Sequence, residues 1–546
     1  MRLYLFLSVL LSLLGILSSA TPAQASVINP TPVIISWPLT KAYPGIEYNI
    51  RLGVTGGKFP YTFSITEGPS GMQISPNGTV TWTPESDLEG QSYNVTLRVE
   101  DSLHQHVSQS FNLNVTQSGF YFVANGGNDD TGTGSITLPW ATINKALASG
   151  NGSDFLYVRG GSYSGALQFQ PNGLNKLAAF PGEQVKVDYN LENGTDIYNS
   201  QTYIDGFEIF NLQRWAFQVD GGKTSEDAQQ SQLILRRNHM HHLYDHTSGG
   251  NPAFLFFWDT NPITDITPEK QYTNNIIQEN VFHDQFDRGS GINGDNTANY
   301  HGGSNVWFNV AYSLYEDNEA YNIDGHGLID KDDGYRNTYR GNYFHDNTFY
   351  PDNPSDPSAG LILMSQHSED GAEVCYNIFE DRLVVGWQPG YIRNVEIHHN
   401  TFYRAGITYR WVLGEPQSTN FITRDNLFSE LESAEGIPFA YMAASNKVLS
   451  DEATFDYNLI GTSSNTIYNG IGGAGGALSF SEWQNNYGKD QNSILDDPQL
   501  LNPVQNEFRP ATGSPACGAA SDGGDIGALS CSITTRPLAP VGLTIQ

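Results

Sequence analysis

The densest group of residues able to do chemistry lies between Asp324 and Asn342, where Lys331 stands among four aspartates. If the segment from Gly327 to Lys331 is a strand, its alternation places Lys331, Ile329 and Gly327 on one face and Asp330 on the other. A lysine on an open face can act as a base when its neutral form is favoured. Neighbouring carboxylates can instead hold it in solvated, inert ion pairs. The residues alone leave both interpretations open.

The segment around Lys331 resembles the β-helix lyases of the chondroitinase B and alginate lyase type, polysaccharide lyase family six. In that family a strand carries two acids, then a lysine, then an asparagine-bearing coil. Here Asp324 and His326 stand seven and five residues before Lys331. The segment from Gly291 to Asn296, roughly one coil upstream, would supply further ligands. The resemblance implies a calcium ion held by Asn293, Asp295 and Asp324.

The reaction implied by this resemblance is β-elimination on a glycan that contains uronic acid. A base removes the proton α to the uronate carboxylate, a metal neutralises that carboxylate, and an acid assists the leaving oxygen. Lys331 takes the role of base, and His367 and Arg340 are the candidates for acid or charge stabiliser. Two positions depart from the family, because Gln366 replaces its arginine and His326 replaces an acid that calcium would prefer.

A glycoside hydrolase is the alternative enzyme. Gly325-His326-Gly327 and the pair Asp332-Asp333 resemble elements of the polygalacturonases, which use paired carboxylates on a β-helix. In those enzymes the aspartate pair precedes the Gly-His-Gly element, whereas here it follows. Asp330, Asp332 and Asp333 would serve as acid and base if turns direct them into one groove.

A third interpretation is a non-catalytic, glycan-binding adhesin, in which exposed tryptophans stack on sugar rings. Packing in the core or groove is the commoner role of such residues. The candidates are Trp258, Trp307, Trp387 and Trp411.

Histidines form a second group that could bind a metal: His239, His241, His242 and His246. The segments Val281–Asp284 and Tyr343–Asp346 place a histidine at the same position after an asparagine, and His398-His399 lies just before Asn400. A recurrence in register indicates turn residues set by a repeat, so we interpret these histidines as structural.

The element that must position these residues is a repeat marked by asparagine. The spacings between successive asparagines of this repeat are 42, 38, 24, 35, 23, 26 and 32 residues. The shortest spacings are typical of one solenoid coil with three brief strands, and the longer ones add loop insertions. Asparagines stacked at one turn satisfy each other's amides and the backbone. The repeated residues are Asn238, Asn280, Asn318, Asn342, Asn377, Asn400, Asn426 and Asn458.

Both ends of this repeat resemble secreted, pectate-lyase-like β-helix proteins. The opening runs from Gly119 to Glu183 and contains a short capping helix near Ala141–Ala148, and the closing coil includes Asn506–Pro510 and Asp525–Ala528. We therefore predict an all-β chain whose residues 118–531 form a right-handed parallel β-helix, followed by a flexible tail at 532–546. Fold does not settle activity, because lyases, hydrolases and binding proteins share this opening.

Residues 26–117 form a unit of their own. Alternating runs at Tyr48–Leu52, Tyr61–Ile65 and Tyr93–Val99 are separated by Gly, Pro and Asn-Gly turns, the pattern of a small antiparallel β-sandwich. The stretch from Gly71 to Pro84 resembles bacterial immunoglobulin-like and cadherin-like modules. Such modules are mostly spacers or weak carbohydrate binders.

The N-terminus reads as a secretory signal, with Arg2, an apolar run from Leu3 to Leu17 and small residues up to Ala25. We expect residues 1–25 to be removed, and a secreted or periplasmic monomer with no membrane span. The net charge of −31 argues against nucleic acid as a partner. An acidic polysaccharide is the expected partner, with arginines and Lys331 gathering positive charge locally.

Three cysteines are too few for a disulfide scaffold. Cys517 and Cys531 are close enough in the chain to pair in an oxidising compartment. Cys375 lies in an apolar, strand-like run and is expected to be a buried free thiol.

Overall fold

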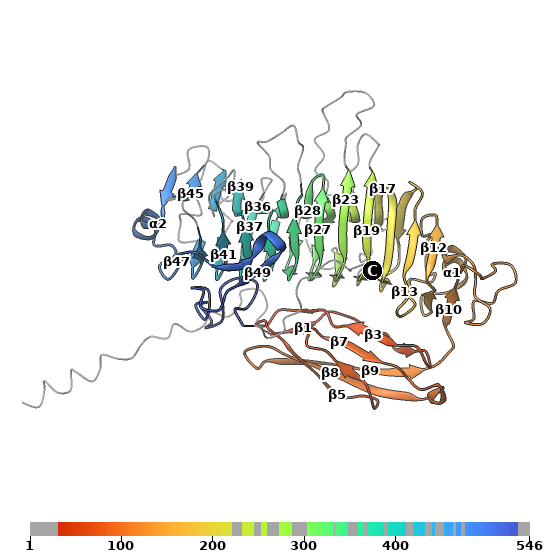
Figure 1. Ribbon diagram of the computed structural model, residues 1–546. Helices are drawn as coiled ribbons and strands as arrows, with labels where there is room; N and C mark the ends of the chain where they lie inside the picture. The colour runs from red at the N-terminus through yellow and green to blue at the C-terminus, as the bar shows by residue number, and fades with distance from the viewer. Residues whose placement is uncertain are drawn as a thin grey trace, which may run out of the picture.

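The computed structural model describes residues 31–220, 232–244, 253–258, 272–286, 303–331, 334–347, 359–364, 368–386, 391–410, 419–431, 439–442, 453–461, 466–470 and 476–532. Within these residues the chain winds into a right-handed parallel β-helix, with a small antiparallel β-sandwich alongside it (Figure 1). This is the fold class that the sequence predicts. The expected signal segment lies outside the described residues, as does the tail beyond residue 532.

The first face of the solenoid is a 16-stranded sheet. Its main ladder is β10 (Phe120–Val123), β11 (Phe155–Val158), β13 (Lys176–Ala179), β16 (Tyr203–Asp205), β18 (Ile234–Arg236), β22 (Ile276–Gln278), β26 (Leu314–Glu316), β30 (Thr338–Arg340), β34 (Glu373–Cys375), β37 (Tyr391–His398), β40 (Thr419–Arg424) and β43 (Ala453–Asp456), and β21 (Tyr272–Thr273), β25 (Val310–Ala311), β29 (Gly334–Tyr335) and β33 (Ser368–Asp370) extend it.

A 22-stranded sheet supplies the other two faces. The second face is β12 (Gly161–Ser164), β14 (Val185–Asp188), the first half of β17 (Phe207–Asp220), β19 (His239–Tyr244), β23 (Val281–Phe286), β27 (Glu319–Ile323), β31 (Tyr343–His345), β35 (Ile378–Phe379), β38 (Thr401–Tyr403), β41 (Leu427–Ser429), β44 (Leu459–Ile460) and β47 (Ile494–Leu495). The third face is β15 (Asn193–Ile197), the second half of β17, β20 (Ala253–Trp258), β24 (Gly303–Phe308), β28 (His326–Lys331), β32 (Ala359–Met364), β36 (Arg382–Val385), β39 (Ile407–Arg410), β42 (Phe439–Met442), β45 (Thr466–Gly470) and the antiparallel β46 (Ala477–Ser479).

The asparagine repeat forms a continuous ladder at the corner between the first and second faces. Asn342 shows the pattern: its Oδ1 accepts from the backbone N–H and Nδ2 of Asn318, at 2.9 and 3.1 Å. Its own backbone N–H and Nδ2 donate to Oδ1 of Asn377, both at 2.9 Å. A residue with positive φ precedes each ladder asparagine, which turns the chain at that corner. The predicted role of these asparagines is confirmed.

Like residues also stack inside the solenoid. Phe344, Phe379, Phe402 and Phe428 form a column whose ring centroids are 5.3, 5.0 and 4.8 Å apart. All four are fully buried. Repeated apolar residues at one coil position therefore build the core coil by coil.

Two short helices close the ends. The helix α1 (Ile143–Ser149) is the one expected near Ala141–Ala148, and Thr142 caps it by accepting from the backbone N–H of Lys145. The helix α2 (Phe480–Tyr487) was not predicted, although Ser479 and Glu482 form a capping box and Trp483 is buried. Short 3-10 helices are η1 (Ser86–Leu88) and η5 (Pro503–Gln505). In the described part of the chain, no helix is long and apolar enough to cross a membrane.

The N-terminal module is a β-sandwich whose strands cover its own small core. It contains β1 (Val33–Ile34), β2 (Lys41–Ala42), β3 (Tyr48–Arg51), β4 (Val54–Thr55), β5 (Thr62–Glu67), β6 (Gln73–Ile74), β7 (Thr79–Trp82), β8 (Ser92–Glu100) and β9 (His106–Val115). The strands β3, β5 and β8 cover the three alternating runs seen in the sequence. The module lies along one side of the solenoid (Figure 1).

The module packs on the outer side of the first face. Apolar residues from both parts share one cluster, in which Ile35 and Tyr43 join Tyr203, Ile276 and Leu314. In the same interface Arg51 forms ion pairs with Glu279, Glu316 and Asp317, at 2.9, 3.2 and 2.5 Å. The outer side of this face is therefore covered by the module where these residues lie.

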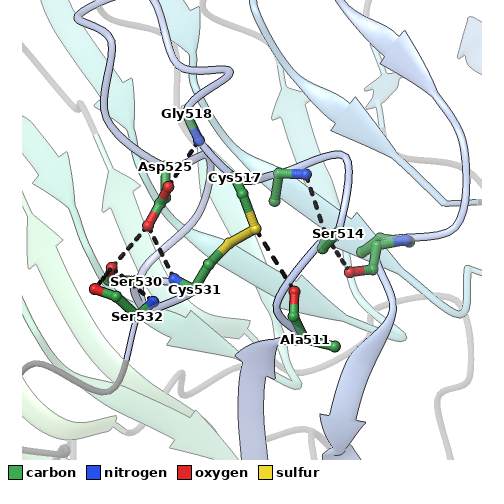
Figure 2. Close-up of a disulfide and its surroundings, with 10 residues drawn as sticks. Ala511, Ser514, Cys517, Gly518, Asp525, Ser530, Cys531 and Ser532 are labelled. Carbon is green, nitrogen blue, oxygen red and sulfur yellow. Dashed lines mark hydrogen bonds between the residues drawn. A yellow bond between two sulfur atoms is a disulfide. The ribbon is translucent and has the colours of Figure 1, made fainter.

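The closing coil carries the antiparallel strands β48 (Leu500–Asn502) and β49 (Glu507–Pro510) and a disulfide between Cys517 and Cys531. Beside that bond the Asp525 carboxylate accepts from the backbone N–H of Gly518 and of Cys531 and from the Ser530 hydroxyl (Figure 2). Cys375 is fully buried and outside any disulfide. Both expectations for the cysteines are confirmed.

Candidate active site

The strand β28 alternates as the sequence predicts. The Asp330 side chain is fully buried inside the solenoid, where its Oδ2 accepts from Asn337 Nδ2 at 2.9 Å and from the Tyr339 hydroxyl. Lys331 points to the opposite side, with Nζ 4.7 Å from the centre of the Phe308 ring. This position corrects the hydrolase interpretation for Asp330, because an inward carboxylate cannot reach a polymer in an outer groove.

Lys331 borders an apolar strip on the outside of the third face. Its register partners are Phe308 on β24 and Met364 on β32. These belong to a cluster of buried outer residues with Val306, Ile329, Ile362 and others. Lys331 itself is half-buried, and it forms no ion pair with any residue that the structure describes. The inert ion pair with a neighbouring aspartate is therefore not seen within the described residues.

Asp324 lies at the other end of β28, in the corner between the second and third faces. Its backbone N–H donates to the carbonyl of Gln285 at 2.9 Å, and Gly325 follows with a φ of 142°. Lys331 is the last of the six residues of β28, so five residue steps separate it from His326 beside this corner, a length of roughly 17 Å along the strand. The structure therefore does not bring Asp324 together with Lys331.

Of the three expected calcium ligands, the structure describes Asp324 alone. His326 is fully buried, and its Nδ1 accepts from the backbone N–H of Ala359 at 3.1 Å. Asp324 is then the single carboxylate among the described candidates, whereas calcium takes six to eight oxygen ligands. The other two proposed ligands, Asn293 and Asp295, lie outside the described residues, as does His367.

Arg340 lies on a different face from Lys331. It belongs to β30 on the first face and points toward the module, where it is 2% exposed. Its guanidinium pairs with Glu316 and donates to the carbonyl of Val54 and the Tyr61 hydroxyl. A role beside Lys331 does not fit this position, because the module and the solenoid enclose the side chain.

The other candidates for chemistry or sugar stacking are mostly not described. Asp332, Asp333 and Gln366, and the tryptophans 387 and 411, lie outside the described residues, and only the backbone of Trp258 is described. Trp307 is fully buried in the core between Phe257, Tyr315 and Tyr339. It is therefore a packing residue rather than a stacking platform for sugars.

Histidines line the outside of the second face in register. His241, His283, Tyr321 and His345 occupy one row of adjacent strands, and their rings stack at 5.1, 4.6 and 4.9 Å between neighbours. Burial lowers the pKa of His239 and of His241 to about 4, so both are neutral near pH 7. The row supports the interpretation of these histidines as positions set by the repeat.

A pair of carboxylates that sequence reasoning missed lies at the corner between β35 and β36. The Asp381 carboxylate accepts from the backbone N–H and Nδ2 of Asn347, at 3.3 and 2.7 Å. Desolvation raises the pKa of Asp381 to about 7. Burial also raises the pKa of Glu380, which accepts from the Tyr343 hydroxyl. A carboxyl group that is half-protonated near neutral pH can act as a general acid.

Only one signal in the sequence could have found this pair. Glu380-Asp381 directly follows the short strand Ile378–Phe379 and forms a two-residue corner. In the preceding coil, the segment at the same corner is longer and comprises residues 346–358. Two adjacent acids at such a short corner must lie close to the face that follows. Their protonation, by contrast, depends on contacts that the sequence does not display.

Comparisons with known proteins support the N-terminal module. Residues 25–116 match the sequence model of a family described as "Putative Ig domain", which confirms the immunoglobulin-like module. No curated protein matches the chain. A solved structure of XylC with xylose shares 12% identity and a TM-score of 0.38, over 70% of this chain and 87% of that one. The family 28 exopolygalacturonase of Yersinia enterocolitica shares 10% identity and a TM-score of 0.36, over 81% and 92%. At such low identity the similarity concerns the fold alone.

Proposed function

We propose that this protein is an exported polysaccharide lyase that cleaves an acidic, uronate-containing glycan, with Lys331 as the base. The observation that carries the proposal is the position of Lys331 on the outside of the third face, half-buried against Phe308 and without an ion pair among the described residues. The resemblance of the opening coils to pectate-lyase-like proteins supports it.

The chemistry assigned to Lys331 is a proton transfer. Its neutral amine takes the proton α to the uronate carboxylate, the electron pair forms a double bond to the β carbon, and the bond from that carbon to the glycosidic oxygen breaks. The leaving oxygen takes a proton from solvent or an acid, so no further reactant is consumed. The apolar strip beside Lys331 would limit the water that competes for the amine.

The test is a screen of uronate polymers for the near-ultraviolet absorbance of an unsaturated sugar, with and without a chelator. On an active polymer, Lys331→Ala should lower kcat by about 100-fold or more. The matched control is Lys186→Ala, because Lys186 pairs with Glu208 on the second face and should not affect turnover. Full activity of the Lys331→Ala variant would remove Lys331 from the mechanism.

A glycoside hydrolase is the second candidate, and Asp381 is the observation that favours it. A carboxyl group with a pKa of about 7 is suited to protonate a leaving glycosidic oxygen. New reducing ends without ultraviolet absorbance, lost in Asp381→Asn, would establish this alternative. Binding of the glycan with neither product would indicate an adhesin.

A further inference from the structure

Three residues that could bind a metal meet in the buried layer between the solenoid and the module. Glu373 and Cys375 are two residues apart on β34, so both point to the outer side of the first face. His398 on β37 is the register partner of Cys375. One ligand atom from each residue lies within 4.8 Å of the others. Their exposures are 6%, 0% and 7%.

The carboxylate of Glu373 has weak compensation for so deep a position. Its Oε2 accepts from the Thr338 hydroxyl at 3.4 Å, and its Oε1 lies 3.3 Å from Nε2 of His398. Within the described residues, no lysine or arginine forms an ion pair with it. A buried carboxylate with only two long contacts is poorly compensated, so a cation bound beside it would stabilise it.

The nearby Arg340 and Arg424 act on the Glu373 carboxylate only from a distance, because their ion pairs are with other carboxylates. Arg340, across from Cys375 on the neighbouring strand, pairs with Glu316 at 2.5 Å. Arg424, across from His398, pairs with Glu396 at 2.5 Å and also with Asp425. Between the two arginines lie the carboxylate of Glu373, the thiol of Cys375 and the imidazole of His398.

We propose that Glu373, Cys375 and His398 bind one zinc ion at the boundary between the solenoid and the module. Thiolate, imidazole and carboxylate are the ligands that zinc prefers, and three of them leave a fourth position for water. The thiolate and the carboxylate together balance the two charges of the ion, and the thiol proton is released to solvent when the ion binds. His398 and Glu373 already stand at the separation expected of two ligands on one zinc ion.

The surroundings suit a structural role for this ion. Tyr376, next to Cys375 in the chain, packs its ring 4.8 Å from that of Phe59 in the module. Tyr376 and His399 also line a cavity of about 480 Å³ between the two parts, which offers a path for the ion. The ion would brace the adjacent strands on which this end of the module rests.

Metal content of the full chain, expressed in medium with zinc or with cobalt, tests the proposal. We expect one equivalent of metal per chain after desalting, and for the cobalt form a near-ultraviolet band from thiolate-to-cobalt charge transfer. Cys375→Ser should lose the band. The matched control is His283→Ala on the second face, where His239 and His283 approach each other at 2.5 Å; it should keep both metal and band.

Two results would overturn the proposal. The first is wild-type protein that carries neither metal nor band after growth in cobalt, which needs no variant and no folding assumption. The second is a band that persists in Cys375→Ser. His398→Ala keeps the thiol, so folded protein of this variant that still retains metal against a chelator would also exclude the site. None of these readouts depends on catalytic activity.

Discussion

Arg340 offers the sharpest test of how the module is held on the solenoid. Its guanidinium donates through Nε to Glu316 at 2.7 Å, and through Nη2 to the carbonyl of Val54 at 2.9 Å. Its Nη1 donates to the Tyr61 hydroxyl at 3.2 Å. Arg340→Met keeps a long apolar stem in this space but removes the charge and every one of these donors.

The size of the effect follows from what Glu316 retains. Removal of one partner from a buried ion pair costs about 3–5 kcal/mol, because the other charge stays buried. Glu316 keeps Arg51 at 3.2 Å and Gln278 at 2.7 Å after the change. We therefore expect the lower end, a loss of about 3 kcal/mol in the free energy of unfolding.

The assay is urea unfolding followed by circular dichroism, with Arg404→Met as the matched control. Arg404 pairs with Glu430 at 2.8 Å, but the two side chains are 49% and 48% exposed. The same substitution there should cost less than about 1 kcal/mol. Equal losses for the two variants would refute the buried ion pair. A folded, stable Arg340→Met protein without turnover would return Arg340 to the active site.

Three further predictions follow from buried or stacked groups. Asn342→Ala removes four buried hydrogen bonds of the ladder and should cost about 3 kcal/mol in thermal or urea unfolding; the exposed Asn322→Ala should cost far less, and similar losses would contradict the ladder's role. Replacement of Cys517 and Cys531 by serine opens a loop with a sequence separation of 14 and should cost about 3 kcal/mol locally. We expect faster amide hydrogen exchange in this variant, confined to residues 514–531. Unchanged exchange there would contradict a stabilising role of the disulfide. Finally, the pKa values of His239 and His241 lie below the unfolded value of about 6.5, so the unfolded chain binds more protons between pH 4 and 6.5. The contribution of these two neutral histidines to stability is present above pH 6.5 and is lost as the pH falls toward 4. In the double variant His239→Gln, His241→Gln, the melting temperature should therefore fall less steeply between pH 7 and 5. An unchanged slope of melting temperature against pH would contradict this.

Much of the fold could be predicted because its signals are local or strictly periodic. The asparagines at one corner predict stacked coils, since each can satisfy the next only when the turns are in register. Alternation along β28 correctly placed Lys331 and Asp330 on opposite faces, because successive side chains of a strand point to opposite faces. The missed helix α2 is only eight residues long, too short for a clear helical period.

The candidate site could be predicted only in part. Lys331 could be separated from Asp330 by alternation, but the resemblance to the lyases grouped it with Asp324, although the extended strand β28 keeps the two apart. The raised pKa of Asp381 could not be foreseen either, because burial and the contact with Asn347 cause it, and that contact spans 34 residues. The same holds for Cys375, whose partners Glu373 and His398 come together through strand register.

By itself, then, the sequence determined the solenoid, the sandwich before it, the disulfide near the C-terminus and the placement of Lys331 and Asp330 on opposite faces of their strand. These properties follow from spacing within a coil and from the two-residue period of a strand. Only the tertiary structure decided which face the module covers, and so which charged residues are buried beneath it. The contact between Arg340 and Tyr61 joins residues 279 positions apart. No local period reports such a contact, and it moves Arg340 from the expected active site to the interface with the module.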